Sequence, residues 1–309
     1  MRVGELAERE VAARLERPGL DLDTGPFVVR LETPIESLAE EVRFLYHDFP
    51  VVPDDGFVDF HVTIGRPSGL RRWWRRQAVF RFDGAMPFEP LPFRMAVPML
   101  EWSLNWCAAT EAHQYVMIHS AVVERNGLTI ILPGVTGSGK STLCAALVHR
   151  GWRLLSDEFA LIRPRDGRLV PWPRPISLKG RSIDLIRRLA PEFRVGSSVP
   201  NTEKGTVAHL QPPAESVRRA NDTAAPTWVV FPTYRADTPT CLSPLLRTRA
   251  FFRLADCSLN YELLGRRGFE TLLQVMESCD AYDLTYGRLE EVLGLLDVLE
   301  PPKSAATGA

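Results

Sequence analysis

The sequence predicts an α/β protein, and three observations point to that class. Apolar residues recur at helical intervals in some segments and in short β-branched runs in others. The chain has 309 residues, 45% hydrophobic and 24% charged, which is enough to bury one large domain or two ordinary ones. A glycine-rich segment lies between an expected strand and an expected helix. We expect a smaller β-rich region over 1–94, a larger α/β region over 95–300 and a disordered tail over 301–309.

The N-terminal region begins with a short amphipathic helix. The apolar residues from Val3 to Leu15 are spaced at helical intervals, and Pro18-Gly19 ends the pattern. Three β-rich runs follow, separated by segments rich in Pro, Gly and Asp, and they predict a small antiparallel sheet. The runs are PFVVRLE, VDFHVTIG and QAVFRFDG.

The larger region begins with a helix over 95–113. Strands are then expected in YVMIHSAVVE and GLTIILPG, a helix in TLCAALVHR, further strands on both sides of Ser156-Asp157-Glu158, and a strand in TWVVFPTY. Two helices, over 262–276 and 289–299, close the region.

Charge and apolar patterning exclude several classes of partner. Lys and Arg number 37 against 38 for Asp and Glu, so nothing draws the whole chain toward nucleic acid or anionic lipid. No apolar run reaches the roughly 18 residues of a membrane span, and the opening MRVGELAERE is charged. We therefore expect a cytoplasmic protein that binds neither nucleic acid nor membrane. Five scattered cysteines predict reduced, buried thiols: Cys107, Cys144, Cys241, Cys257 and Cys279.

The central motif is the glycine-rich segment 134–141, which matches G-x-x-x-x-G-K-[ST]. Glycines let the loop curl so that successive N–H groups point at phosphate oxygens, and the following helix adds its partial positive charge. Lys140 would contact the β- and γ-phosphates of ATP, and the Ser141 hydroxyl would bind Mg²⁺. A glycine-rich turn with an incidental lysine is the alternative. The predicted nucleotide-binding residues are Gly134, Val135, Thr136, Gly137, Ser138, Gly139, Lys140, Ser141 and Thr142.

Two adjacent acids, Asp157 and Glu158, follow the motif. They lie at an expected strand edge, where they predict a Mg²⁺ ligand, assigned to Asp157, and a general base. Asp157 follows Lys140 by 17 residues, which leaves room for one helix, a turn and a strand. This short spacing argues against a motor, GTPase or transporter ATPase. The alternative is a turn with two solvated acids.

His119 lies on the strand before the motif's own strand. A histidine on a strand is commonly a packed, hydrogen-bonded core residue. Beside a phosphate loop, however, a neighbouring carboxylate can tune it to assist proton transfer.

Together, IHSAVV, LPGVTGSGKSTL and GWRLLSDEFALI resemble the catalytic domain of HPr kinase/phosphorylase. The resemblance implies the fold of phosphoenolpyruvate carboxykinase nucleotide domains, with His119 as a helper histidine and Asp157 and Glu158 as the acid pair that holds metal and deprotonates a serine. Glu158 departs from the usual two aspartates, so which acid is the base stays open. The family's phosphorolysis signature is not found. Relatives of this kind form rings, which is consistent with a homo-oligomer.

Within that family, the segments PISLKG, NTEKGTVAHLQPP and GFETLLQVMESCDAYDLTY are similar to the HPr-kinase-related kinase A group. The resemblance is firm over 95–165 and softer to 299. It implies a serine or threonine of a small protein or peptide, rather than HPr itself, as the acceptor.

Several cations are secondary candidates. Lys179 and Lys204 lie in loop-like segments and could close over the phosphates, although most loop lysines are merely solvated. The cluster RRWWRR over 71–76 could dock an acidic peptide or stack single-stranded nucleic acid. The favoured alternative is a basic surface hairpin with its tryptophans on the sheet, and peptide docking is preferred over nucleic acid. Arg163, Arg165 and Arg168 could meet phosphate or form an exposed turn.

The sequence as a whole predicts a Mg-ATP-dependent kinase with His119, Lys140, Asp157 and Glu158 as catalytic residues and Ser141 and Asp157 as metal ligands. Two alternatives stay open. One is a kinase of a small metabolite, which the same loop and acids would serve. The other is an ATP-gated peptide-binding module without phosphoryl transfer.

Overall fold

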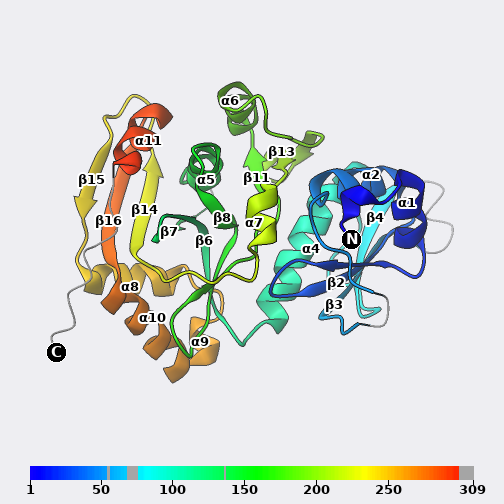
Figure 1. The fold of residues 1–309 in the computed structure, drawn as a ribbon, viewed down its shortest axis with the longest axis horizontal. Helices are drawn as coiled ribbons and strands as arrows, with labels where there is room; N and C mark the ends of the chain where they lie inside the picture. Colours follow the sequence, from blue (N-terminus) through cyan, green and yellow to red (C-terminus); the bar gives the residue numbers. More distant parts are fainter. Residues whose placement is uncertain (54–55, 68–75, 136, 299–309) are drawn as a thin grey trace. The chain divides into compact units, whose positions relative to one another are not determined.

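The computed structural model describes residues 1–53, 56–67, 76–135 and 137–298 (Figure 1). It is a mixed α/β protein, as predicted, and it divides into two compact units. Unit 1 combines 1–112 with 173–220, and unit 2 combines 113–172 with the chain from 221 onward. The units are defined by packing, so the functional boundary expected after residue 94 stays a prediction. The tail over 301–309 lies outside the described residues.

Unit 1 holds a five-stranded sheet in the order β1-β2-β3-β4-β5 and a three-stranded antiparallel sheet in the order β11-β13-β12. The first sheet comprises β1 (Leu20–Asp23), β2 (Val28–Glu32), β3 (Phe60–Gly65), β4 (Gln77–Phe82) and β5 (Leu91–Pro92), and the second β11 (Ile176–Lys179), β12 (Val199–Thr202) and β13 (Gly205–Leu210). The unit's helices are α1 (Glu8–Glu16), α2 (Glu36–Leu45), α4 (Ala96–Glu111), α6 (Arg181–Leu189) and α7 (Ala214–Arg218).

The three predicted N-terminal strands are confirmed as β2, β3 and β4, but the expectation that they pair antiparallel throughout is wrong. β2 and β3 are parallel. The reason is the connection between them: α2 lies between the two strands in sequence, and a helical crossover returns the chain in the same direction. The hydrophobic runs predict strands, but they do not reveal the direction in which neighbours pair.

A buried polar group ties residue 174 to the rest of unit 1. The Arg174 guanidinium donates to Glu101 on α4 at 2.9 Å, and the Tyr46 hydroxyl donates to the other carboxylate oxygen at 2.6 Å. All three side chains are nearly inaccessible to solvent. Buried charges are tolerated when they are paired and hydrogen-bonded, so this contact fixes where the segment from 173 onward joins the unit.

Unit 2 is built on one eight-stranded sheet in the order β10-β9-β6-β7-β14-β16-β15, with β8 also paired to β6. β14 runs parallel to β7 and β16. The strands are β6 (Val116–Arg125), β7 (Leu128–Pro133), β8 (Arg153–Ser156), β9 (Phe159–Ile162), β10 (Leu169–Val170), β14 (Trp228–Tyr234), β15 (Cys241–Pro244) and β16 (Asp280–Tyr286). The helices are α5 (Lys140–His149), α8 (Arg247–Asp256), α9 (Tyr261–Leu264), α10 (Arg266–Ser278) and α11 (Leu289–Asp297).

Local sequence explains the centre of this sheet. Asn126 and Gly127 both have positive φ, at 53° and 81°, which suits the tight turn that joins β6 to β7. Every residue of β7 is buried, in agreement with its continuous apolar sequence. The core of the unit continues through β14 and β16 to helices α8 and α10.

The cysteines agree with the prediction in part. All five are free thiols, and Cys107, Cys144 and Cys279 are buried. Cys257 is half-buried, and Cys241 is exposed because it begins the edge strand β15. Within the described residues, the structure contains no helix both long and apolar enough to cross a membrane.

Candidate functional site

The glycine-rich loop lies between the end of β7 and the start of α5, as the motif predicts. Thr136 lies outside the described residues. Gly137 and Gly139 have φ angles of 92° and 93°, a conformation that only glycine adopts without strain. The loop delivers the chain directly into α5, whose first residues are Lys140, Ser141 and Thr142.

Contacts from two neighbouring strands hold the loop in place. The Tyr234 N–H, at the end of β14, donates to the Ser138 carbonyl oxygen at 3.0 Å. The Tyr286 hydroxyl, at the end of β16, donates to the Gly139 carbonyl oxygen at 3.1 Å. Because β7, β14 and β16 are parallel, their carboxyl ends meet at the same sheet edge.

Lys140 and Asp157 are both buried, with 6% and 3% of their surface exposed. Their charges act on a common neighbour, the Cys144 thiol on α5. Burial raises the pKa of that thiol well above its ordinary value; the Asp157 carboxylate adds to the rise and the Lys140 ammonium opposes it. The loop lysine and the first acid are therefore both buried near the Cys144 thiol.

The acid pair lies in the turn between β8 and β9. Ser156 shapes this turn, because its hydroxyl oxygen accepts a hydrogen bond from the Phe159 N–H at 3.1 Å. Glu158 differs from Asp157 in its surroundings: its side chain is 20% exposed and directed toward His119. The structure thus gives the two acids distinct environments.

His119 connects the acid turn to the glycine-rich loop. Its Nε2 lies 3.4 Å from Glu158 Oε2. Its carbonyl oxygen accepts a hydrogen bond from the Gly134 N–H at 3.4 Å, and its own N–H donates to the Cys257 carbonyl oxygen at 2.8 Å. The side chain is 31% exposed, so the ring is accessible to a ligand or substrate.

The residues present fit a nucleotide and a magnesium ion. Ser138 Oγ is buried and, within the described part of the chain, has no hydrogen-bond partner, so a phosphate oxygen could satisfy it. No group of three or more His, Cys, Asp or Glu side chains gathers among the described residues. Mg²⁺ needs no such cage, because one or two carboxylates together with substrate phosphates commonly hold it.

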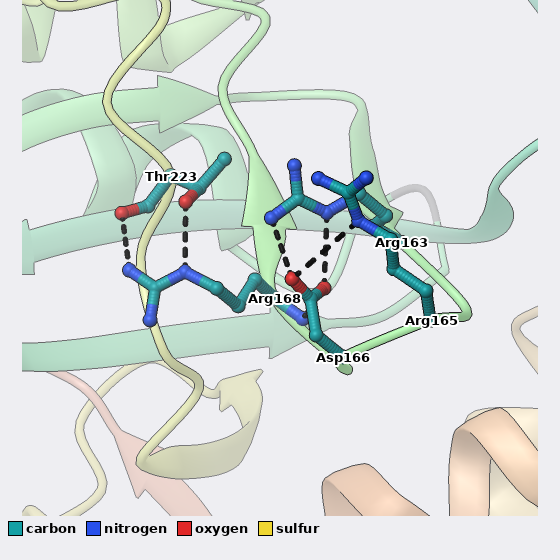
Figure 2. A network of polar contacts seen from close by, with 5 residues as sticks. All are labelled: Arg163, Arg165, Asp166, Arg168 and Thr223. Carbon is teal, nitrogen blue, oxygen red and sulfur yellow. Dashed lines mark hydrogen bonds and ion pairs between the residues drawn. The ribbon is translucent and has the colours of Figure 1, made fainter.

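The arginines near the end of β9 form a closed turn (Figure 2). Arg163 makes a two-pronged contact with the Asp166 carboxylate, at 3.0 and 2.6 Å. This contact lowers the pKa of Asp166. Arg168 donates to the hydroxyl and carbonyl oxygens of Thr223, both at 2.7 Å. Arg165 Nε lies 3.9 Å from Asp166 Oδ2. These contacts favour the exposed-turn interpretation over phosphate binding.

The remaining cationic candidates belong to unit 1. Lys179 ends β11, and Lys204 lies in the turn between β12 and β13 with its Nζ 5.7 Å from the centre of the Trp102 ring. Their expected action on phosphates stays a prediction. Within the basic cluster over 71–76, residues 71–75 lie outside the described part.

Comparison with known proteins gives partial matches. HPr kinase/phosphorylase of Clostridium botulinum (strain Eklund 17B / Type B) is 38% identical over 53 residues, which is 17% of this chain and 17% of that protein. The enzyme of the same name from Limosilactobacillus reuteri (strain DSM 20016) is 28% identical over 98 residues, 30% of each chain. The chain is distantly related to HPr kinase/phosphorylase. No protein-family model matches.

The matches to HPr kinase/phosphorylase span less than a third of the relatives' length. They confirm the expected resemblance at the level of a distant relationship. Membership of the HPr-kinase-related kinase A group stays a prediction, as do the roles of the individual site residues.

Tyr234, Tyr286 and Cys257 are the residues near the site that the sequence reasoning missed. One signal could have found the tyrosines: TWVVFPTY and DAYDLTY are both strand-like runs that end on tyrosine. Their approach to the loop depends on the order of the strands, which the runs alone do not reveal.

Proposed function

We propose that this chain is a cytoplasmic kinase that transfers the γ-phosphoryl group of Mg-ATP to a serine or threonine hydroxyl of a small protein or peptide. The observation that carries the proposal is the contact between the His119 and Glu158 side chains. The His119 carbonyl oxygen also accepts a hydrogen bond from the Gly134 N–H of the glycine-rich loop. A carboxylate and a histidine in contact beside a phosphate loop are suited to accepting a proton. The proposal includes a nucleotide domain like that of phosphoenolpyruvate carboxykinase and a place in the HPr-kinase-related kinase A group.

The loop residues from Gly134 to Thr142 would bind the triphosphate through backbone N–H groups, the Lys140 ammonium and the Ser138 hydroxyl. Ser141 and Asp157 would hold Mg²⁺, which neutralises charge on the phosphates when bound. The buried position of Asp157 supports this division of roles, because a buried carboxylate needs a cation nearby.

Glu158 is the better candidate for the base. It is the more exposed of the two acids, so an acceptor hydroxyl can reach it. In the proposed step the acceptor oxygen forms a bond to the γ-phosphorus, and the bond from that phosphorus to the β–γ bridging oxygen breaks. The hydroxyl proton passes to Glu158, and His119 orients the carboxylate. Phosphoryl transfer otherwise depends on positioning and charge neutralisation.

The cytoplasmic location is part of the proposal. Five free cysteines suit a reducing compartment, and none is paired in a disulfide. ATP is also available there.

The test is incubation of the protein with γ-labelled Mg-ATP and a cytoplasmic extract, followed by separation of labelled proteins, peptides and metabolites. The Asp157→Asn variant and the exposed control Asp184→Asn are run in parallel. A labelled peptide or protein that depends on Asp157 but not on Asp184 supports the proposal. Label confined to a small molecule would indicate a metabolite kinase. Tight nucleotide binding without any transfer would indicate an ATP-gated binding module.

A further inference from the structure

Two tyrosines occupy corresponding positions at the ends of neighbouring parallel strands. Tyr234 on β14 is paired in register with Tyr286 on β16, and their ring centres are 5.6 Å apart at 63° between planes. Their exposure differs sharply. Tyr286 is 2% exposed, whereas Tyr234 is 50% exposed.

The burial of Tyr286 is explained by its contact with the glycine-rich loop. Its hydroxyl donates to the Gly139 carbonyl oxygen, and a Cβ added at Gly139 would lie 2.3 Å from that hydroxyl oxygen. Tyr234 also touches the loop, but through its backbone N–H and its Cβ, which lies 3.0 Å from the same added Cβ. The Tyr234 hydroxyl makes no hydrogen bond within the described part of the chain, so the aromatic ring is left available beside Gly139.

Arg235 follows Tyr234 in sequence and is an exposed planar cation. Its backbone N–H donates to the Tyr286 carbonyl oxygen at 2.9 Å, while its guanidinium forms no ion pair among the described residues. The loop that follows is packed closely on Gly287, where an added Cβ would lie 2.6 Å from the Thr238 carbonyl oxygen. The backbone under Tyr234 and Arg235 is therefore held firmly, and their side chains project from a fixed base.

The orientation of a triphosphate bound to the loop would place its nucleoside beside Tyr234 and Arg235. The motif's lysine meets the β- and γ-phosphates, and the loop's backbone N–H groups meet the α- and β-phosphates. In the proposed mechanism His119 and Glu158, on the β6–β9 side of β7, face the γ-phosphate. The nucleoside would then lie on the opposite side of β7, where β14 pairs with it and Tyr234 lies against Gly139. An aromatic face and a guanidinium are the groups on which nucleobases stack in proteins.

We propose that Tyr234, assisted by Arg235, is the stacking surface for the purine base of the nucleoside triphosphate. This inference rests on the proposed nucleotide-binding function and adds the residues that would recognise the nucleoside. Tyr286 positions the loop for the phosphates, and Tyr234 binds the base. The two tyrosines thus have different roles: one holds the phosphate-binding loop and the other contacts the base.

The test compares Mg-ATP with magnesium tripolyphosphate, which has the phosphate chain but no base. Affinities are measured by isothermal titration calorimetry for the wild type, Tyr234→Ala, Tyr234→Phe and Arg235→Ala. We expect Tyr234→Ala to weaken ATP binding about tenfold or more and to leave tripolyphosphate binding within about twofold. Tyr234→Phe keeps both affinities, and Arg235→Ala weakens ATP binding by a smaller factor. The backbone N–H that holds Ser138 is present in all three variants.

Unchanged ATP affinity in Tyr234→Ala would overturn the stacking role, and so would an equal loss for both ligands, which would indicate damage to the loop. Failure of the proposed kinase function gives a different result. If the wild type binds ATP in a base-dependent manner but transfers nothing, the base site stands and the kinase does not. If the wild type binds neither ligand, both proposals are wrong.

Discussion

His119 Nε2 lies 3.4 Å from Glu158 Oε2, across the pairing of β6 with β9. The neighbouring acid, Asp157, is instead buried. Its charge and the charge of Lys140 both act on the Cys144 thiol. Adjacent positions in a tight turn thus place the Glu158 carboxylate toward a histidine and bury the Asp157 carboxylate. This separation gives the two acids different expected roles.

Glu158→Gln removes the carboxylate charge and keeps the side chain's shape. We expect a fall in the transfer rate of about 10²–10⁴-fold, with ATP affinity almost unchanged, because general-base catalysis contributes on that scale. His119→Asn should cost less, since the histidine orients the acid. Rate and affinity are measured separately by single-turnover transfer and calorimetry. A Glu158→Gln enzyme with wild-type turnover would show that Glu158 is not the base.

Lys140→Ala removes the ammonium that would contact the β- and γ-phosphates. We expect transfer to fall by about 10²–10³-fold or more, because a charge aimed at the transferring group is lost. Circular dichroism should show that the fold is intact. Arg9→Ala, which removes an exposed cation of α1 in unit 1, is the control. Retained transfer in Lys140→Ala would contradict the mechanism.

Asp157→Asn should lower Mg²⁺-dependent turnover more than ATP binding. The carboxylate is proposed to hold the metal, whereas the loop's backbone binds most of the triphosphate. Turnover is measured as a function of Mg²⁺ concentration, and the metal requirement should shift to higher concentration. An unchanged turnover number and metal requirement would remove Asp157 from the site.

Gly139→Ala and Gly137→Ala form a matched pair for the loop. Both glycines have φ near 90°, so each alanine costs about 1–2 kcal/mol of backbone strain. An alanine Cβ at 139 would also meet the Tyr286 hydroxyl at 2.3 Å, whereas at 137 no atom of the described residues lies within 4 Å. Thermal unfolding should therefore show a greater loss of stability for Gly139→Ala. Tyr286→Phe should partly rescue that variant, and equal losses at the two positions would contradict the described packing.

The cysteines should differ in reactivity toward a thiol reagent at pH 8. Burial raises the pKa of Cys107 and Cys279 to about 12, so only about one molecule in 10⁴ carries either thiolate at that pH. Cys241 is exposed and should react first. Mass spectrometry identifies the modified residue, and unfolding in urea should make all five reactive. Early labelling of Cys107 or Cys279 in the native protein would contradict the structure.

The sequence by itself determined the local features of the chain. The G-x-x-x-x-G-K-[ST] pattern identified the loop, since its glycines and lysine are adjacent and local spacing suffices to recognise them. Hydrophobic periodicity likewise predicted strands β2, β3, β4 and β14 and helix α4 close to their observed bounds. The roles assigned to the site residues stay predictions.

Only the tertiary structure decided the relationships between distant segments. Strand order brought Tyr234 and Tyr286 against Gly139, and the α2 crossover made β2 parallel to β3. The sequence could not separate Asp157 from Glu158, because burial depends on what packs against each side chain. A local pattern records which elements the backbone prefers, whereas pairing and burial follow from long-range contacts that no short segment contains.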